Sequence, residues 1–522
     1  MVTYQYQRVT YDDGCWADVH TAKLPADALA FMDFETRGKR AQLVDTCKRC
    51  LIKAERRGED NPLAIVYETP ERGPIRDVFP SAQAIVHEGE TLLDAVSFVN
   101  CIMWRIVSNC WASVSYERAS GAFALDLLPD AIPQSERHNV QLVWDWLTCA
   151  DRLYVHGLRP DVKLTASFDA HAYLVGIAPH DFLSDLNHVS HHALLFNTAF
   201  FLLEPDDYAS VHSRLGEAYN LYIKAGEIVR PPLYQRAAYL HGDDGQVWAQ
   251  RVSMQHVEIT LPNSLRLIPD ENLAINPTVP HELTLYTRTH NATRGEALTG
   301  RTPNAPGRLE LVIVDQHIVG WKRDGDLHIP QNGYVLSFAP DVAPDTQHDA
   351  WLGDLLVTYT PEATLRGVQQ GLQGGPLLLA GSEIALDAHT LRQEEFYPQQ
   401  GDRSLPWHGV VPKYFPFDVD QTRAARVGIG VTASGEVVVV AVDGVNGGNR
   451  DERDSYGATL LELAQHLQSA GAVDAINLDG GGSTQMFVHG GQVTRSSNRR
   501  ASRGLLYERM VPSIGLAHFH RG

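Results

Sequence analysis

Beyond about residue 150, hydrophobic residues come in short runs that are broken by glycine, proline and asparagine. Runs of this length between turn-forming residues are typical of β-strands. The clearest of them are LYVHGL (153–158), HVEITL (256–261), LELVIV (309–314) and EVVVVAVDG (436–444). The pattern therefore predicts a strand-rich region from about residue 151 to the C-terminus.

One segment of this region has the spacing of a helix instead. Apolar residues at positions 460, 461, 464 and 467 predict a helix over 456–470, and Gly471 then ends it. The next residues, AVDAINL, predict a short strand. Before residue 150, the segments 37–57 and 91–116 also have helical spacing. Segment 37–57 is strongly basic, which fits either a solvated helix face or a phosphate-facing surface.

Charge and composition narrow the classes of partner. The chain has 522 residues and a net charge of −19, so its field would repel nucleic acids and anionic membranes. The N-terminus shows no signal peptide, and the most apolar stretch, 193–203, is too short to span a bilayer. We therefore expect a cytoplasmic protein without nucleic-acid or membrane partners. Its six cysteines are expected to be reduced.

The candidate chemistry lies in the segment DAINLDGGGSTQM, 474–486. We call residues 477–484 the glycine-rich turn. Three consecutive glycines let the backbone turn sharply and turn its N–H groups toward a ligand. An aspartate beside them would repel an anion, so catalysis, or ligation of a cation or of sugar hydroxyls, explains Asp479 better. A plain strand-to-loop turn and an actin-like phosphate-binding turn are the alternatives, but the latter places its aspartate two residues before the first glycine.

This segment resembles the signature of the phosphodiester glycosidase family. Six further segments resemble family elements in the right order: ALLFNTAFFL (193–202), NLYIKAGEIV (220–229), LTLYTRTHNATRG (283–295), GLQGGPLLLAGSEI (371–384), AARVGIGVTASGEVVVVAVDG (424–444) and ERMVPSIGL (508–516). The family usually has Asn-Gly-Gly-Phe at 197–200, often Arg at 445 and often Asn at 513. Here these positions hold Asn-Thr-Ala-Phe, Val445 and Ser513, which puts the identity of the sugar in doubt.

The resemblance implies a fold and a domain division. We expect an α+β catalytic domain at 151–522, with a mixed β-sheet core and flanking helices. A smaller, helix-containing N-terminal region of unknown role is expected at 1–150.

The resemblance also implies an activity: hydrolysis of the glycosidic C–O bond of a sugar-1-phosphodiester, which releases free sugar and a phosphate monoester. Asp479 is the first candidate for the base or nucleophile, and Asp443 is the second. Arg426 and Arg509 are the candidates for the phosphate, because a guanidinium binds phosphate through two hydrogen bonds. The candidates for the remaining substrate contacts are Asn197, Asn477, Gly480, Gly481, Gly482, Ser483 and Thr484.

Two other functions stay open at this point. One is a non-catalytic binder of phosphorylated sugars, and the other is a metal-assisted phosphodiesterase. The histidines at 188, 191 and 192 keep a metal in view, although spacing alone does not make a metal site. We predict neither a metal nor another cofactor, and expect a small-molecule or oligosaccharide phosphodiester as the partner. The sequence leaves the oligomeric state undetermined.

Overall fold

The chain forms two compact units. The first comprises Met1–Phe34, His180–Phe201 and Ala218–Gly522, and the second comprises Glu35–Pro179 and Leu202–Glu217. The computed structural model describes residues 1–33, 183, 192–202, 217–290, 300–344, 355–396, 420–445, 454–495, 497, 509 and 511–519, together with the backbone of the other strands given below. The predicted boundary between residues 150 and 151 lies outside the described residues and stays a prediction.

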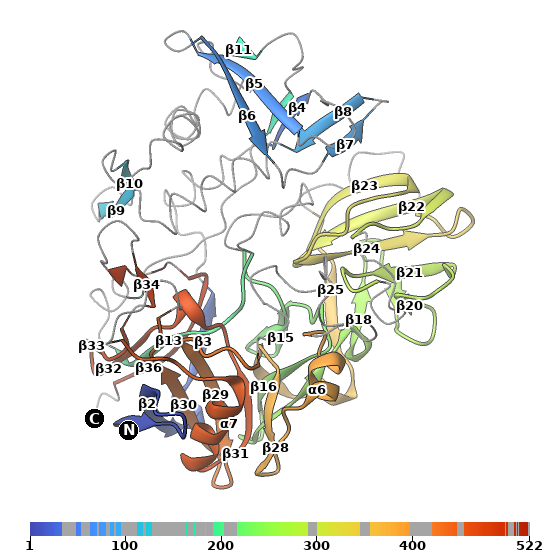
Figure 1. The fold of residues 1–522 in the computed structure, drawn as a ribbon. Helices are drawn as coiled ribbons and strands as arrows, with labels where there is room; N and C mark the ends of the chain where they lie inside the picture. The colour runs from blue at the N-terminus through green and yellow to red at the C-terminus, as the bar shows by residue number, and fades with distance from the viewer. Residues whose placement is uncertain are drawn as a thin grey trace. The chain divides into compact units, whose positions relative to one another are not determined.

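The centre of the first unit is a seven-stranded antiparallel sheet (Figure 1). Its outer strands β1 and β2 come from the start of the chain, and β2 pairs with β30 from Val19–Val442 to Pro25–Glu436. In sheet order the strands are β1 (Thr3–Thr10), β2 (Trp16–Pro25), β30 (Glu436–Val442), β29 (Arg426–Thr432), β31 (Ala472–Asn477), β27 (Leu377–Ala380) and β28 (Glu383–Ile384).

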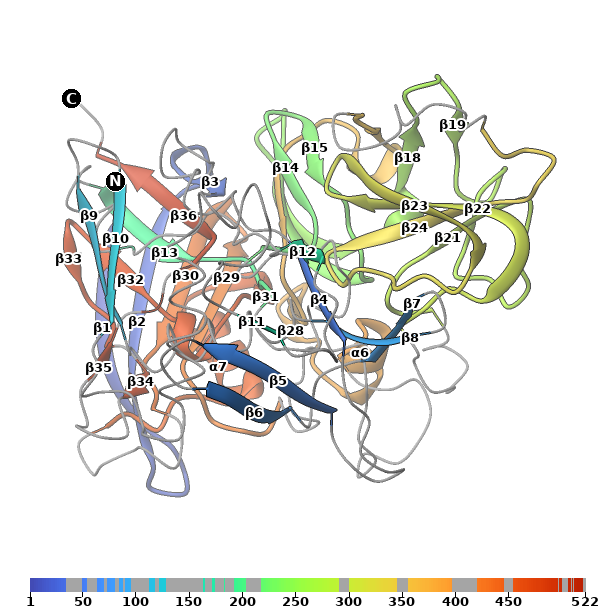
Figure 2. The ribbon, with the colours of Figure 1, turned by 90° about the horizontal axis from the view of Figure 1, so that it is seen from above.

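Helix α7 (Leu460–Ser469) packs on one face of this sheet (Figure 1, Figure 2). It begins with a capping box, in which Thr459 accepts from the Glu462 amide and Glu462 accepts from the Thr459 amide. Leu463 and Leu467 are buried, whereas Leu461 is 45% exposed. The helix predicted at 456–470 is confirmed over Leu460–Ser469 but begins four residues later than expected, with Leu463 rather than Leu461 on its buried face.

Four further sheets complete the described part of the first unit. The first three have five strands each and the last has three; all pairs are antiparallel except β20–β21. The first sheet has the order β3 (Ala30–Asp33), β36 (Ser513–His518), β13 (His192–Asn197), β32 (Met486–Val488) and β33 (Gly491–Gln492), and the second has the order β15 (Glu227–Arg230), β14 (Tyr222–Lys224), β26 (Val368–Gln373), β16 (Arg236–Gly242) and β17 (Val247–Val252). The third has the order β20 (Ala274–Ile275), β21 (Leu283–Tyr286), β24 (Gly333–Phe338), β22 (Asn304–Val314) and β23 (His317–Gly325). The three-stranded sheet has the order β19 (Arg266–Leu267), β18 (Val257–Thr260) and β25 (Thr358–Pro361). A hairpin joins β34 (Asn498–Arg499) to β35 (Leu506–Tyr507).

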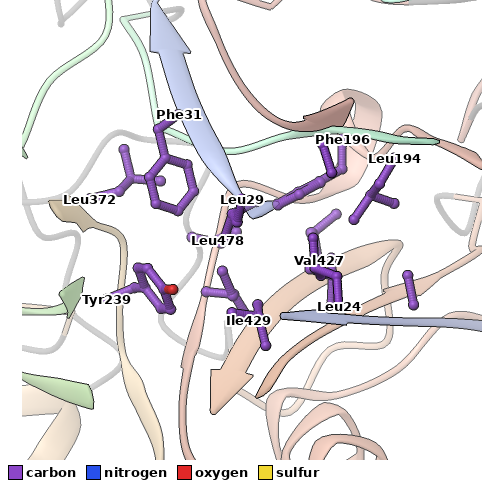
Figure 3. Close-up of a cluster of buried hydrophobic side chains, with 14 of the residues drawn as sticks. Leu24, Leu29, Phe31, Leu194, Phe196, Tyr239, Leu372, Val427, Ile429 and Leu478 are labelled. Atoms are coloured by element: carbon purple, nitrogen blue, oxygen red, sulfur yellow. The ribbon is translucent and has the colours of Figure 1, made fainter. Parts of the chain in front are cut away.

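A single hydrophobic cluster joins three of these sheets (Figure 3). Val427 and Ile429 come from the seven-stranded sheet, Phe196 from the sheet of β13, and Tyr239 from the sheet of β16. Leu478, the second residue of the glycine-rich turn, lies in the same cluster and is fully buried. The turn therefore starts inside the core, which fixes the position of the residues after it.

The second unit is described by its backbone alone. It contains two antiparallel sheets, β11–β5–β6 and β12–β4–β8–β7, and a hairpin of β9 and β10. The bounds are β4 (Arg49–Lys53), β5 (Leu63–Thr69), β6 (Gly73–Phe79), β7 (Ala84–His87), β8 (Glu90–Asp94), β9 (Ala112–Glu117), β10 (Ala122–Leu127), β11 (Lys163–Leu164) and β12 (His171–Tyr173).

The predicted α+β class with flanking helices is wrong. The described residues form many antiparallel sheets and only two α-helices, α7 and the six-residue α6 (Ala388–Gln393). Within the predicted helix 37–57, residues 49–53 form strand β4 instead. Over so few residues, the spacing of apolar residues does not distinguish a strand from a helix. No helix within these described ranges has the length and apolarity needed to cross a membrane.

Candidate functional site

Asp443 and Asp479, the two acidic residues singled out from the sequence, lie at the same end of the strands of the seven-stranded sheet. Asp443 follows the end of β30, and Asp479 follows the end of β31. Both strands pair with β29, in which Arg426 lies opposite Val442 and Gly428 opposite Asn477. Because β30 and β31 run in the same direction on either side of β29, their C-terminal ends bring the two carboxyl groups to the same edge.

The glycine-rich turn packs tightly against the backbone of β29. A Cβ on Gly480 would lie 2.8 Å from the Ala425 carbonyl oxygen, and Gly481 has a φ of +58°. The Gly481 amide donates to the Ala425 oxygen at 2.7 Å, and the Gly480 amide donates to Asp479 Oδ1 at 3.0 Å. The glycines thus serve close packing, and these two amides bind protein acceptors rather than an external anion.

Asn197, at the end of β13, holds the two ends of this turn together. Its Nδ2 donates to the Asp479 carbonyl oxygen at 2.8 Å, and its Oδ1 accepts from the Gln485 amide at 2.9 Å. The Asp479 amide donates to the Thr198 oxygen at 3.0 Å. Asn197 is therefore placed as a support for the turn, and its amide group is engaged by the protein.

The carboxyl group of Asp479 is buried and stays protonated to unusually high pH. The residue is 8% exposed, and burial raises the pKa of its carboxyl from 3.8 to about 7. A hydrogen bond from Ser483, the charge of Arg509 and the Gly480 amide lower this pKa, but burial outweighs them. A carboxyl group with a pKa near neutrality can accept and donate protons at physiological pH.

Several polar atoms of residues close to Asp479 in sequence are buried without a hydrogen-bond partner in the described structure. They are Asn477 Oδ1, Thr484 Oγ1 and Gln485 Oε1. Asn477 Nδ2, by contrast, donates to the Gly375 oxygen at 3.0 Å. Buried polar atoms are normally paired, so unpaired ones in the same turn as a carboxyl of raised pKa make this turn a candidate ligand site.

Asp443 belongs to a chain of side chains that the sequence did not indicate. His20 Nε2, on β2, lies 3.3 Å from Asp443 Oδ2, and His20 Nδ1 lies 2.9 Å from the Tyr4 hydroxyl. The Arg495 amide donates to Asp443 Oδ1 at 3.0 Å. Burial raises the pKa of Asp443 as well, against the lowering effect of His20. No local motif could have indicated His20, because 423 residues separate it from Asp443.

The two predicted arginines occupy different surroundings. Arg426 is buried, and its Nε and Nη2 donate to the carbonyl oxygens of Ala458 at 3.1 Å and Thr422 at 2.8 Å. Burial lowers its pKa to about 10. Arg509 Nη1 lies 3.4 Å from Ser483 Oγ, and its positive charge acts on Asp479. The structure thus brings Arg509 to the glycine-rich turn and directs Arg426 toward backbone carbonyls.

Two of the departures from the family pattern contact each other. Thr198 Oγ1 and Ser513 Oγ are 2.7 Å apart and both residues are buried, although 315 positions separate them. The pairing links β13 to β36 directly beside the Asp479 amide. The sequence singled out both positions but gave no sign that they touch.

Within the ranges that the structure describes, no group of three or more His, Cys, Asp or Glu side chains is arranged to hold a metal ion. Of the clustered histidines, His192 lies on β13 with its ring centroid 5.0 Å from that of His518. Residues 188 and 191 lie outside the described residues.

A comparison with models of protein families gives a match to part of the chain. Residues 295–516 match the family model described as phosphodiester glycosidase. Asn197 lies before this range, whereas Asp443, Asp479 and Arg509 lie inside it. A comparison with curated proteins finds no match.

Solved structures give three weak likenesses. A hypothetical protein from Synechocystis is 16% identical with a TM-score of 0.37, over 99% of this chain and 81% of that one. The catalytic domain of zebrafish N-acetylglucosamine-1-phosphodiester alpha-N-acetylglucosaminidase, auto-inhibited by its pro-peptide, is 11% identical with a TM-score of 0.37, over 100% and 83%. A putative exported protein from Burkholderia pseudomallei is 16% identical with a TM-score of 0.39, over 99% and 96%.

At TM-scores below 0.5, none of these three likenesses supports a statement about fold or function. The family match itself bears out the resemblance seen in the sequence. Over residues 295–516, this chain is similar in sequence to the phosphodiester glycosidase family.

Proposed function

We propose that the protein hydrolyses the glycosidic C–O bond of a sugar-1-phosphodiester. Either water or the Asp479 carboxylate attacks the anomeric carbon. The bond from that carbon to the bridging oxygen breaks, and its electron pair leaves with the phosphate monoester; a glycosyl ester on Asp479 is then cleaved by water at the same carbon. Asp479 takes part as the general base that accepts the proton of the water, or as the nucleophile that water later displaces. Either route releases free sugar and a phosphate monoester.

One observation carries this proposal: the carboxyl group of Asp479 is buried in the glycine-rich turn, and burial raises its pKa to about 7. At neutral pH a substantial fraction of such a group is ionised, so a base is present, and its protonated form can return the proton. The Gly480 amide, the Ser483 hydroxyl and the charge of Arg509 all favour the ionised form of Asp479, and burial raises the pKa in spite of them.

The leaving group explains why a single well-placed carboxyl group can suffice. An ordinary glycosidase needs a second carboxyl group to protonate an alkoxide as it leaves. A phosphate monoester has a second pKa of about 6, so it leaves at neutral pH with little protonation. Arg509 supplies positive charge close to Asp479, because its charge lowers the pKa of the Asp479 carboxyl.

The orphaned oxygens of Asn477 and Thr484 suit the sugar. Sugar hydroxyls donate as well as accept, so Asn477 Oδ1 and Thr484 Oγ1 can take hydrogen bonds from them. Asn197 holds the turn in shape through one hydrogen bond on each of its amide atoms, to the Asp479 oxygen and from the Gln485 amide.

The test is direct incubation of the protein with UDP-sugars and other sugar-1-phosphodiesters, followed by mass spectrometry for free sugar. Release of free sugar by the unmodified protein but not by Asp479→Asn supports the proposal. Binding without turnover across the panel would favour a non-catalytic binder of phosphorylated sugars instead.

A further inference from the structure

Arg236, the first residue of β16, is a buried cation with most of its donors unused. It is 0% exposed and ranks first by volume among the fully buried side chains. Its Nε donates to the Glu394 carbonyl oxygen at 3.3 Å, whereas Nη1 and Nη2 have no hydrogen-bond partner among the described residues. A buried guanidinium with two unpaired NH₂ groups is costly to the folded state, so a ligand that pairs them is the simplest explanation.

Aromatic rings hold this guanidinium in place. Its Cζ lies 4.1 Å from the ring centroid of Phe396, 4.5 Å from that of Tyr234 and 5.9 Å from that of Phe200. Cation–π contacts use the flat face of the guanidinium, so its N–H donors, which lie in the plane, remain available at the edge. The rings therefore hold the Arg236 side chain in position, while its Nη1 and Nη2 groups have no hydrogen-bond acceptor among the described residues.

Arg236 lies close to the glycine-rich turn. Gly375 connects the two: its carbonyl accepts from Asn477 Nδ2 at 3.0 Å, and its amide donates to the Asn477 oxygen at 2.9 Å. A Cβ on Gly375 would lie 3.3 Å from Arg236 Cβ. Gly375 thus lies between Asn477 of the glycine-rich turn and the start of the Arg236 side chain.

We propose that Arg236 binds the phosphate group of the substrate through the edge of its guanidinium. This inference rests on the proposed function and names a cation that the sequence did not single out. The planar fork of an arginine matches two phosphate oxygens, and a buried, pre-positioned guanidinium loses little side-chain entropy on binding. Arg426 cannot offer the same edge, because its Nε and Nη2 already donate to carbonyl oxygens.

The neighbouring carboxyl groups are compatible with an anion. Glu394 accepts from Arg251 Nε at 3.1 Å and from the amides of Leu377 and Ala237, so its charge is already compensated. Glu395 interacts with Arg236 electrostatically, its Oε2 is buried without a partner, and burial raises its pKa to about 7. In its neutral form Glu395 would donate to the phosphate rather than repel it.

The test is a calorimetric titration of the full chain with inorganic phosphate, at constant ionic strength, with acetate as a parallel arm. Arg236→Met fits between the rings without charge, and Arg236→Lys keeps the charge without the fork. Arg251→Lys is the matched control, because Arg251 lies beside Glu394 but has partners on its Nε and Nη2. We expect both Arg236 variants to bind phosphate about tenfold or more weakly, and Arg251→Lys to bind it normally.

The outcomes separate this inference from the proposed function. No phosphate binding by the unmodified protein, equal binding by Arg236→Lys, or a stronger response to acetate than to phosphate would overturn it. If neither Arg236 variant folds, the charge of Arg236 serves the fold itself, and this result too would overturn the inference. If the sugar-1-phosphodiesters are not hydrolysed while the phosphate titration behaves as expected, the proposed function fails and the anion site stands.

Discussion

At the scale of single residues, the decisive feature is a carboxyl group, that of Asp479, whose burial raises its pKa to about 7. The sequence singled out Asp479, because an aspartate beside three glycines is a poor choice for binding an anion, and its role stays a prediction. It could not distinguish Arg509 from Arg426, since side-chain direction at the edge of a sheet depends on tertiary packing. It gave no sign of His20 or Arg236, whose importance arises from contacts with segments more than 150 positions away.

The first prediction concerns Asp479→Asn. We expect turnover of a sugar-1-phosphodiester to fall by roughly three or more orders of magnitude, because the variant has no group that can accept a proton or attack carbon. In the unmodified protein, kcat/KM should rise with pH through an apparent pKa near 7 as the carboxyl group ionises. A rate that falls over this range would instead make Asp479 a general acid.

The stability of the same variant is its control. Between about pH 4 and pH 7 the folded protein keeps the proton on Asp479, while the unfolded chain has lost it, so the unmodified protein loses stability as pH rises. Asparagine keeps the neutral form at every pH. We therefore expect Asp479→Asn to match the unmodified protein at pH 4 and to exceed it by about 1–4 kcal/mol at pH 8 in urea unfolding. A variant destabilised at both pH values would mean that the lost activity reflects misfolding.

At the scale of elements, local signals predicted what local interactions determine. Helix α7 was found because its cap, its apolar stripe and Gly471 are adjacent in sequence. The strands at 309–314 and 436–442 were found for the same reason. The pairing of the turn with Asn197, which lies 282 positions from Asp479, could not be found, because the strand that carries Asn197 approaches the turn only in the folded sheet.

The second prediction tests Asn197 as the support of the turn. Asn197→Ala leaves the Gln485 amide and the Asp479 oxygen without these partners in a buried place, so we expect a loss of about 2–4 kcal/mol in the free energy of unfolding. Activity should fall as well, because the position of Asp479 relaxes.

Asn272→Ala is the control. The Asn272 side chain also makes two hydrogen bonds to the backbone, at 2.7 and 2.9 Å, but Asn272 is exposed. We expect it to cost less than about 1 kcal/mol and to leave activity intact. Equal losses from both variants would argue against a special role for Asn197.

At the scale of the whole molecule, residues distant in sequence complete the same sheets. Strands β1 and β2 extend the sheet that carries both acidic residues, and β3 pairs with β36. Composition and periodicity could not indicate this, because strand partners are set by long-range pairing. The expected α+β class is wrong for a related reason. The resemblance implied flanking helices, whereas the described residues form mainly antiparallel sheets.

The third prediction tests this contribution of the N-terminal strands. Phe31 on β3 is 6% exposed and belongs to the central cluster, so Phe31→Ala should lower the free energy of unfolding by about 3–5 kcal/mol. Gln5→Ala on the exposed strand β1 should change it by less than about 0.5 kcal/mol. Urea unfolding followed by tryptophan fluorescence measures both. Similar small effects from the two variants would mean that β3 is not part of the cooperative core.

The most direct measurement of the central claim is hydrolysis of a sugar-1-phosphodiester in ¹⁸O-labelled water. If Asp479 promotes attack at the anomeric carbon and the phosphate monoester leaves, mass spectrometry will find the label in the free sugar and none in the phosphate monoester. Label in the phosphate monoester would show attack at phosphorus and cleavage of the P–O bond. That result would contradict the mechanism even if the substrate class were right.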